Sequence, residues 1–597
     1  MPKGIKLALK EIESALGDGL ALRANNIALR LIPDHGENIR LLQLYGLSLA
    51  RLGATESARG YLEKALRLDP VSGETAGILG RVYKDIFKKT AKPEVAVLSR
   101  DTYLSGYRAS SDFYPGINAA SMSAVIGETA KARAIALEII KKIPAESESY
   151  WELATLGEAY LLTGNAEQAE FYYSRAVASG SRIGDINSSY HQVMFLQDYI
   201  NIPQKILALL SPPGVVAFSG HMIDAPDRSF PRFPESTVPA IQRQIEEYIE
   251  HNNIQIGYCS AACGADILFA EALFARGGEV NILLPFRDDD FVRTSVAFAG
   301  ERWIVRFRKV LQHAIVSRVT SEGYYGGDEI YRFLSKIIIG KAMLRASQML
   351  TSPSLLTVSV PESASLIGGA RDVASMWPFP ERHVNIDPSL AAVDPAAVKP
   401  AHQHETGKKP EKPERSLPPG IQHAMKCILF ADVVGYSRLQ EDQTPFFMYE
   451  VLHSVAGQIA KIERQPEILN TWGDAFFAVY ERSIDLIYLA KVLRDIFVGT
   501  DWSSKGLPAH LNIRIALHAG PVFIAEDPIR KEQNGYGSHI NRTARIEPIT
   551  VPGCIYASAQ FAALLRMETA ERYRYEYVGK LELPKKAGLQ DVYHISC

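Results

Sequence analysis

The sequence has few cysteines, little net charge and no long apolar run. Its 597 residues include five cysteines, too few and too scattered for a disulfide scaffold, which favours a reducing compartment. Lys and Arg number 65 against 67 Asp and Glu, so the net charge of −2 indicates neither nucleic acid nor an anionic membrane as a partner. No apolar stretch reaches the ~20 residues of a membrane helix, and residues 1–14 mix charged with apolar side chains, unlike a signal peptide. We therefore expect a cytoplasmic protein.

Several folded regions and one linker follow from length and composition. A chain of 597 residues exceeds the ~250–300 residues at which a single core stops growing. Hydrophobic residues make up 47% and charged residues 22%, as in globular proteins, which excludes a fibrous or wholly disordered chain. Residues 378–420 are rich in Pro, Lys, Glu and Ala, so we predict a disordered linker there, with an ordered arm on a neighbouring domain as the alternative. This linker separates residues 213–377 from residues 424–597.

Residues 1–210 show the apolar periodicity of paired helices. Gly46 and Ala58 are small where two helices must approach closely, and Pro70 ends the second helix. This spacing, repeated at residues 149–180, is that of the tetratricopeptide repeat, a helix pair of ~34 residues. Such pairs stack and leave a concave surface, so we expect a protein partner on the repeats; a purely structural helical spacer is the alternative.

Two motifs in this region carry a further resemblance. The segments YPGINAA and YWELATLGEAYLL, within residues 90–200, resemble the TRAF-binding helical domain of apoptosis signal-regulating kinases and its bacterial relatives. The resemblance implies a role in protein interaction or assembly rather than in chemistry.

Residues 213–377 alternate strand and helix patterns. Four buried-strand candidates share a short apolar run: residues 215–220, 254–260, 280–286 and 355–360. Helical patterns between them predict a Rossmann-like parallel α/β sheet, in which ligands bind at the carboxyl ends of strands. Gly264 opens a helix after small polar residues, an arrangement that exposes backbone N–H groups to an anionic phosphate.

The segments GYCSAACGADILFAEALFARGGEVNILLPF and ASLIGGARDVASMW resemble the SLOG superfamily of Rossmann-like domains, which is related to the Lonely Guy proteins. The resemblance implies a nucleotide-like ligand, held by a set of loop residues: Ser260, Gly264, Asp266, Gly368 and Gly369. The alternative is that these glycines serve chain geometry alone. Cys259 and Cys263 have no second pair nearby, so buried thiols are favoured over a zinc site.

The C-terminal region, residues 424–597, carries two aspartates at the ends of predicted strands. A buried strand delivers Asp432 to its end, followed by a turn through Gly435 into a helix. Asp474 lies in the glycine turn of a predicted β-hairpin. A strand over 511–523, a helical segment and a terminal strand–basic turn–strand follow. Either aspartate alone would be interpreted as a helix cap or a turn residue.

The ordered set FADVVGYS, GDAFF, HAGPV, GSHINRTAR and the basic terminal hairpin resembles the class III nucleotidyl cyclase catalytic domain, which has an α+β ferredoxin-like fold. That family forms a 3′,5′-cyclic nucleotide and pyrophosphate from a nucleoside triphosphate. The resemblance implies that Asp432 and Asp474 bind two Mg²⁺ or Mn²⁺ ions, for which carboxylates are suited. It assigns the β- and γ-phosphates to the backbone of four residues: Val433, Val434, Gly435 and Tyr436.

Asn541 and Arg545 are four residues apart on a predicted helix and so project from one face. By resemblance Asn541 orients the ribose, Arg545 stabilises charge on the α-phosphate, and Lys585, with Lys586 second, contacts phosphate. An ordinary ion pair between Arg545 and Glu547 is the alternative. In this family the aspartates and the Asn–Arg pair of one site come from different subunits, so the resemblance implies a homodimer.

Asn470 and Asn534 occupy the positions that select the base in this family. Adenylate cyclases commonly carry Lys and Asp or Thr there, whereas guanylate cyclases carry Glu and Cys. An amide both donates and accepts, so it can pair with adenine, guanine or a pyrimidine. ATP is favoured because adenylate cyclases dominate the bacterial members. Cyclisation of GTP or a pyrimidine nucleotide in a defence-type system is the alternative.

These patterns together predict a signalling enzyme made of helical repeats, a central α/β sheet and a cyclase domain. We expect its N-terminal domains to regulate it through a long tether, by mass action or dimer geometry rather than as a rigid lever. One alternative is a nucleotide-binding scaffold that acts through the repeats. Another is a hydrolase in the middle domain, although its loops offer no convincing nucleophile–base pair.

Overall fold

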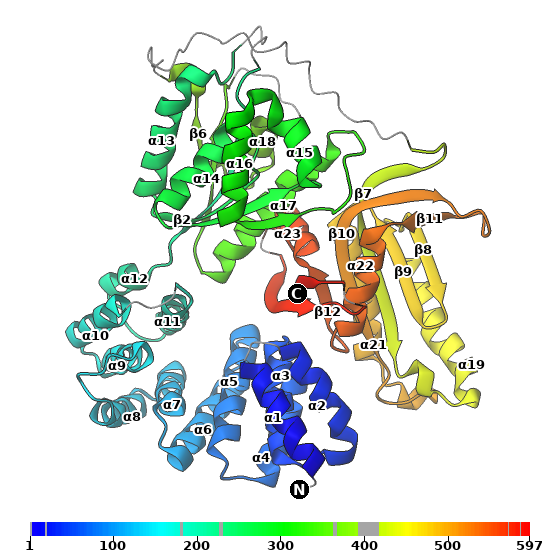
Figure 1. Ribbon diagram of the computed structural model, residues 1–597. Coiled ribbons are helices and arrows are strands. Elements are labelled where there is room, and N and C mark those ends of the chain that lie inside the picture. The colour runs from blue at the N-terminus through cyan, green and yellow to red at the C-terminus, as the bar shows by residue number, and fades with distance from the viewer. Residues whose placement is uncertain are drawn as a thin grey trace. The chain divides into compact units, whose positions relative to one another are not determined.

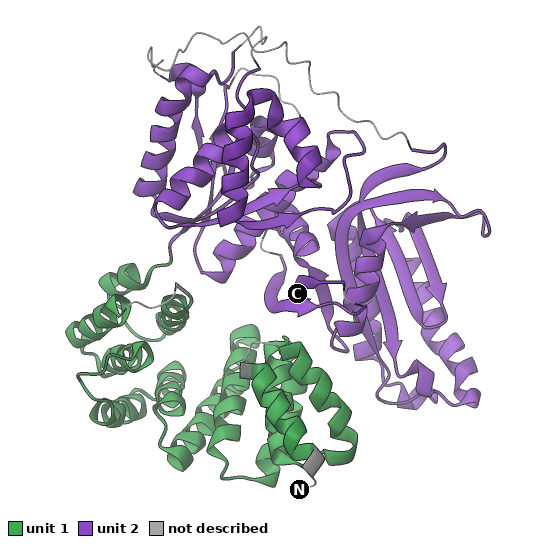
Figure 2. Ribbon diagram, in the orientation of Figure 1, with its two compact units in different colours: residues 1–212 green, residues 213–597 purple. Residues whose placement is uncertain are grey.

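The computed structural model describes residues 3–17, 21–179, 183–225, 231–361, 367–391, 417–570, 572–585 and 587–596. The chain divides into two compact units, Met1–Pro212 and Pro213–Cys597, which we describe one at a time (Figure 2). Across the described ranges, no helix combines the length and the apolar character needed to cross a bilayer.

The first unit is a series of helix pairs. From α1 to α10, each helix packs against the next one along the chain (Figure 1). The helices are α1 (Lys3–Gly17), α2 (Ala21–His35), α3 (Ile39–Arg51), α4 (Thr55–Leu68), α5 (Gly73–Thr90), α6 (Pro93–Ser110), α7 (Phe113–Val125), α8 (Thr129–Lys142), α9 (Tyr150–Thr163), α10 (Ala166–Ala178), α11 (Ile183–Leu196) and α12 (Gln204–Leu210).

Small residues set the approach of these helices, as predicted. A Cβ atom at Gly46 would lie 2.5 Å from Cγ of Leu62, and one at Gly157 would lie 2.8 Å from the ring of Tyr173. Ala58, in the helix pair of α3 and α4, is fully buried. The predicted close helix pairs are therefore confirmed in both copies of the repeat.

The second unit begins with a parallel sheet in the order β4-β3-β2-β1-β5-β6. Its strands are β1 (Gly214–Gly220), β2 (Ile254–Cys259), β3 (Glu279–Leu284), β4 (Ile315–Arg318), β5 (Pro353–Val358) and β6 (His383–Ile386). Its helices are α13 (Val238–His251), α14 (Ala265–Ala275), α15 (Asp288–Ser295), α16 (Glu301–His313), α17 (Glu329–Gln348) and α18 (Ala370–Met376). The predicted parallel α/β sheet is confirmed. The strand order reverses between β1 and β5, which makes a topological switch point.

β6 lies inside the stretch predicted as a disordered linker, residues 378–420. It pairs in parallel with β5 and buries Ile386, whereas Val384 and Asn385 are exposed. Backbone hydrogen bonds at a sheet edge thus hold a segment that has little apolar surface to bury. The linker prediction is wrong for this strand, and residues 392–416 lie outside the described residues.

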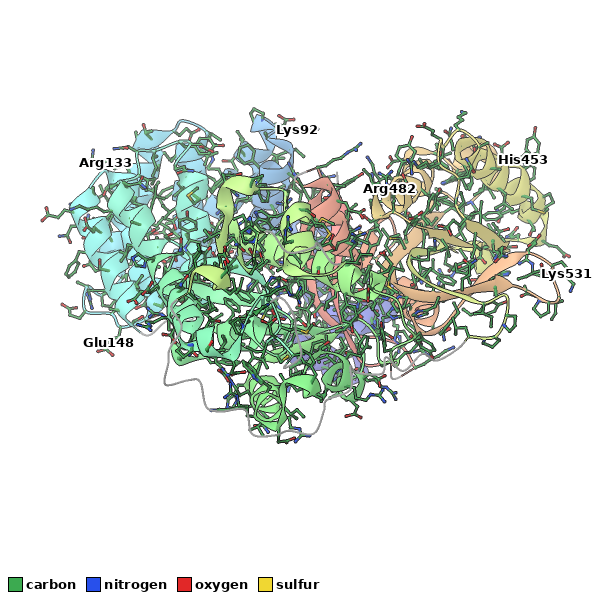
Figure 3. All side chains as sticks on the ribbon, turned by 90° about the horizontal axis from the view of Figure 1, so that it is seen from above. Lys92, Arg133, Glu148, His453, Arg482 and Lys531 are labelled. Atoms are coloured by element: carbon green, nitrogen blue, oxygen red, sulfur yellow. The ribbon has the colours of Figure 1, made fainter. Side chains whose placement is uncertain are left out.

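The remainder of the second unit is a mixed sheet in the order β13-β14-β12-β10-β7-β9-β8, with β11 paired to β10. Its strands are β7 (Gln422–Val434), β8 (Ile468–Trp472), β9 (Ala475–Tyr480), β10 (Asn512–Glu526), β11 (Gln533–Tyr536), β12 (Ile555–Ser558), β13 (Arg574–Glu582) and β14 (Leu589–Ser596). Its α-helices are α19 (Thr444–Phe446), α20 (His453–Ile459), α21 (Ser483–Gly499), α22 (Ser538–Ile546) and α23 (Ala559–Thr569). Figure 3 shows Lys531 in the loop that joins β10 to β11.

The two faces of this mixed sheet are covered differently. Cys427 and every second residue after it in β7 belong to the large core that includes α20, α21 and α23. The residues between them, Ile428 and Phe430, belong to a smaller cluster that Ile540 of α22 covers. Asp432 follows in step with Ile428 and Phe430, so it projects from the less covered face.

The two halves of the second unit share one core. α17 lies along α23, and a Cβ atom at Gly340 would overlap the backbone carbonyl oxygen of Ala563 (Figure 1). Buried residues of both halves, among them Ile337 and Phe561, belong to one apolar cluster. The expectation that the middle domain acts only through a long tether is therefore wrong, because the two halves are in direct contact.

Gly340→Val should destabilise the second unit by about 2–3 kcal/mol, because the added side chain must displace the backbone of α23. Urea unfolding measures the change. Gly457→Ala in α20 is the matched control, since a Cβ atom there meets nothing within 4 Å; it should be neutral or stabilise by up to about 1 kcal/mol. Equal stability of Gly340→Val and the wild type would contradict the close helix contact.

Candidate active site

Two aspartates meet at one end of the cyclase-like sheet. β7 and β9 are antiparallel, and Asp432 lies opposite Ala475, the residue after Asp474. Asp474 lies in the turn between β8 and β9, together with Gly473, which has a φ of 68°. The predicted hairpin is therefore confirmed. Burial raises the pKa of Asp432, and the Asp474 carboxylate raises it further. Burial also raises the pKa of Asp474.

This pair has the chemistry of a hard-cation site. Burial raises the pKa values of both half-buried carboxylates, and the nearby Arg514 guanidinium lowers that of Asp432 by less than burial raises it. Within the described ranges, no cluster of three or more His, Cys, Asp or Glu side chains suits a metal ion. An ion here would need other oxygen ligands as well. Mg²⁺ typically binds one or two carboxylates together with water and substrate phosphates, and the two aspartates fit that requirement.

Glu547, which the sequence motif does not single out, adds a third carboxylate. Burial raises its pKa to about 7, and Asp432 is the next largest cause. Arg514 of β10 forms an ion pair with it at 3.6 Å. Among the described residues Arg545 has no ion pair, so the alternative pairing of Arg545 with Glu547 is contradicted. Only the folded chain could show this carboxylate beside the aspartates, because Glu547 is distant from them in sequence.

The predicted phosphate loop differs from the expectation. Val433 and Val434 are the last two residues of β7. Gly435 follows with a φ of 100°, and Tyr436 begins a three-residue 3₁₀ turn. A 3₁₀ turn, and not the predicted α-helix, follows Gly435 directly. The next helical run starts after Gln440, whose side chain forms a capping box with Gln443. The backbone N–H groups at this strand end and tight turn are thus the candidate hydrogen-bond donors to the phosphates.

An aromatic cluster lies on the same face as Asp432. Its three rings have centroids 4.9 to 6.3 Å apart: Phe430, Trp472 and Phe477. Asn470 of β8 is buried between these strands, with 7% of its surface exposed. Asn534 lies on β11, which contacts β8. The two predicted base-selecting amides therefore come from neighbouring strands beside an aromatic surface.

α22 carries both Asn541 and Arg545, one turn apart, as predicted. Asn541 is exposed and Arg545 is half-buried. Lys585 is exposed in the turn between β13 and β14, with a φ of 59°, and Lys586 lies outside the described residues. No hydrogen bond or ion pair within the described part of the chain joins Asn541, Arg545 or Lys585 to the two aspartates.

A buried histidine pair holds α22 against the sheet. Nε2 of His518 in β10 lies 2.8 Å from Nδ1 of His539 in α22, and the rings stack at 8°. Nδ1 of His518 lies 2.6 Å from Oγ of Ser558, which also caps α23. A Cβ atom at Gly520 would overlap the His539 ring. His518 and Gly520 of the HAGPV motif therefore position the helix that carries Asn541, a role that the motif alone did not indicate.

The middle domain holds a cavity of about 470 Å³ at the carboxyl ends of its strands. Four of the five predicted loop residues line it: Ser260, Asp266, Gly368 and Gly369. Gly264 does not line it. A Cβ atom at Gly264 would lie 2.7 Å from the backbone nitrogen of Ile223, so this glycine serves chain geometry, the alternative considered above.

Asp266 ties together two of the loops around this cavity. Its carboxylate accepts backbone hydrogen bonds from Gly220 at 3.2 Å and from Ala262 at 3.3 Å. Burial raises the pKa of Asp266 to about 7. Cys259 and Cys263 are buried free thiols, as predicted.

Comparison with known families agrees with this geometry. Residues 421–596 match the model of the adenylate and guanylate cyclase catalytic domain. The protein is a nucleotidyl cyclase enzyme. Residues 21–123 match the tetratricopeptide repeats-sensor family, which confirms the predicted repeat character of these helices. The TRAF-binding and SLOG resemblances stay predictions.

Solved structures similar to this chain align with 26–30% of it. The adenylyl cyclase CyaB from P. aeruginosa is 14% identical over 30% of this chain and 96% of its own, with a TM-score of 0.27. The guanylate cyclase domain of RhGC from Catenaria anguillulae, in complex with GTP, is 16% identical over 30% and 98%, with a TM-score of 0.26. An adenylate cyclase from Trypanosoma brucei is 18% identical over 29% and 87%, with a TM-score of 0.26.

The histidine pair predicts an acid-labile cyclase domain. Burial lowers the pKa of His518 and lowers that of His539 to about 3, whereas unfolded histidine has a pKa near 6.5. The unfolded chain therefore takes up protons first, so the stability contributed by the neutral pair is full above about pH 6.5 and is lost toward pH 3. In His539→Gln, the slope of the unfolding free energy against pH should be smaller by about 1.4 kcal/mol per pH unit just below pH 6.

Urea unfolding between about pH 7 and pH 5 tests this expectation. His313→Gln, at an exposed histidine of α16, is the control and should keep the wild-type slope. An unchanged slope in His539→Gln would contradict a neutral buried pair.

Proposed function

We propose that the protein converts a nucleoside triphosphate into a 3′,5′-cyclic nucleotide and pyrophosphate. The observation that carries the proposal is the half-buried pair Asp432 and Asp474, each with a raised pKa, on the less covered face of a cyclase-family sheet. The 3′-hydroxyl oxygen attacks the α-phosphorus, the hydroxyl proton is lost to a base or to solvent, and the bond to the bridging oxygen breaks as pyrophosphate leaves.

Asp432 and Asp474 would hold two Mg²⁺ or Mn²⁺ ions. Such ions neutralise the triphosphate and make the hydroxyl easier to deprotonate. The strand end and turn at Val433–Tyr436 offer backbone N–H groups to the β- and γ-phosphates, since consecutive N–H groups in a turn attract anions. These residues orient the triphosphate so that its α-phosphorus faces the hydroxyl.

α22 supplies the groups on the other side of the reacting phosphate. Asn541 orients the ribose through its amide, and Arg545 stabilises the charge that grows on the α-phosphate oxygens. Arg545 is available for this role because Glu547 pairs with Arg514 instead. Lys585, exposed on the terminal hairpin, contacts a phosphate oxygen.

The active unit is a homodimer with two equivalent sites. Asn541 is exposed and makes no bond to the aspartates of its own chain within the described residues. Twofold symmetry lets Asn541 and Arg545 of each subunit serve the aspartates of the other. A chain with one copy of each group then forms two complete sites.

ATP is the proposed substrate, with GTP or a pyrimidine nucleotide as the alternative. Asn470 is buried and lies opposite Phe477, whose ring packs with those of Phe430 and Trp472 into a surface for a base. Amides at Asn470 and Asn534 present a donor and an acceptor each, so both edges of adenine can be matched.

With its upstream domains, the protein would act in signalling, and the cytoplasm is its proposed location. The helical repeats would bind a protein partner on their concave surface. The 470 Å³ cavity of the middle domain, lined by Ser260, Asp266, Gly368 and Gly369, would bind a nucleotide-like ligand, since it lies at the carboxyl ends of strands next to the topological switch.

Complementation between two inactive variants tests the shared site. Asp432→Ala and Arg545→Ala should each lose most turnover when purified alone. The two variants are then co-expressed, or mixed and refolded, in equal amounts. About a quarter of wild-type activity should return, because half of the dimers contain one subunit of each variant and each such dimer keeps one of its two sites. The measurement is cyclic nucleotide formed per minute.

Asp495→Asn and Arg464→Ala, both at exposed positions of the same domain, are controls and should keep wild-type activity. Full activity in either single variant would indicate that the domain binds nucleotide without this chemistry. Two inactive variants that never complement would place all the groups of one site in one subunit.

A further inference from the structure

α17 contacts both the cavity and the cyclase half. Residues on one side of this helix line the 470 Å³ cavity: Tyr331, Leu334, Ser335 and Ile338. Farther along, Gly340 lies against the backbone of Ala563 in α23. The helix is continuous from Glu329 to Gln348, so a shift on its cavity side also moves its contact with α23.

The segment just before α17, residues 319–325, contacts the cyclase half at both of its ends. We call this segment the clamp loop. The backbone carbonyl of Val319 accepts a hydrogen bond from Nε2 of Gln560 in α23 at 2.9 Å. The ring of Tyr325 lies 5.0 Å from that of His423 and 5.3 Å from that of Phe523, at the edge formed by β7 and β10.

Between these attachments the clamp loop reaches the catalytic helix itself. Oε1 of Glu322 accepts a hydrogen bond from Oγ of Ser538 at 3.0 Å. Ser538 is the first residue of α22, so a negative carboxylate lies at the positive end of this nine-residue helix. Glu322 is in turn held by Thr320, whose Oγ1 accepts its backbone N–H at 3.1 Å.

The position of this contact matters because Asn541 and Arg545 follow Ser538 by about one and two helical turns. Tilting the start of a short helix displaces both side chains relative to the sheet. A displacement of about 1 Å can lower the rate of a reaction that depends on orientation by about a hundredfold.

We propose that the clamp loop positions α22 in the cyclase site and that Glu322 is its positioning residue. Through α17, the contact between the clamp loop and α22 then depends on what fills the cavity. This inference rests on the proposed cyclase function for its effect on turnover. The middle domain then controls the enzyme through a packed contact.

Removal of the contact is the first test, in the full-length protein. Glu322→Ala and Ser538→Ala should each lower kcat about tenfold with little change in KM, as expected for loss of a hydrogen bond to a charged group that orients the site. The double variant should be no slower than either single one, because both remove one interaction. Glu322→Gln keeps an acceptor and should recover most of the activity, and Glu301→Ala at an exposed position of α16 is the control.

Hydrogen–deuterium exchange of the peptide that covers α22 gives a readout independent of turnover. Exchange there should rise in Glu322→Ala and stay at the wild-type level in Glu301→Ala. Unchanged exchange in Glu322→Ala would overturn the clamp. Should the wild type form no cyclic nucleotide while exchange still rises, the proposed function fails and the clamp stands.

Filling the cavity after folding is the second test. Thr294 lines the cavity, and its Oγ1 lies 3.3 Å from the hydroxyl of Tyr331 on α17. Thr294→Cys, modified with benzyl methanethiosulfonate, should change kcat about fivefold or more. The change should vanish when Glu322→Ala is also present. Wild-type protein treated with the same reagent is the control, since its described cysteines are buried.

An equal effect of the benzyl group with and without Glu322, or no effect in either protein, would overturn the link between the cavity and α22.

Discussion

Burial of two carboxylates that a β-sheet places near each other is the constraint on which the catalytic half depends. The pairing of β7 with β9 brings Asp432 next to the turn that holds Asp474. Alternation along β7 makes this register strict, because a slip by one residue would turn Asp432 into the core that Ala431 and Val433 fill. The carboxylates thus stay close together and half-buried, an arrangement that a cation stabilises and that raises their pKa values when no cation is bound.

Local patterns in the sequence were enough to predict the elements that carry the site. The strand before Asp432, the hairpin at Asp474 and the helix with Asn541 each depend on a few neighbouring residues, and the structure confirms all three. Contacts between distant residues were not predictable in this way. Glu547 comes close to Asp432, and His539 bonds to His518, only because the sheet and α22 bring together segments that lie far apart in sequence.

Three wrong predictions have physical causes that composition hides. Only a 3₁₀ turn follows Gly435, and the longer helical run begins later, where the capping box of Gln440 and Gln443 provides a local helix start. The stretch around β6 looks like a linker because it is polar, yet backbone hydrogen bonds to β5 need no apolar side chains. The packing of α17 on α23 at Gly340 likewise replaces a tethered arrangement with a shared core, which gives the middle domain a direct mechanical route to the cyclase half.

Product analysis with the purified full-length protein tests the central claim most directly. The protein is incubated with Mn²⁺ and, in turn, ATP, GTP, CTP and UTP, and the products are identified by mass spectrometry. The account predicts one preferred 3′,5′-cyclic nucleotide formed in equal amount with pyrophosphate, and its loss when a chelator removes the cation. Absence of any cyclic product from all four nucleotides, or formation that persists without divalent cation, would contradict it.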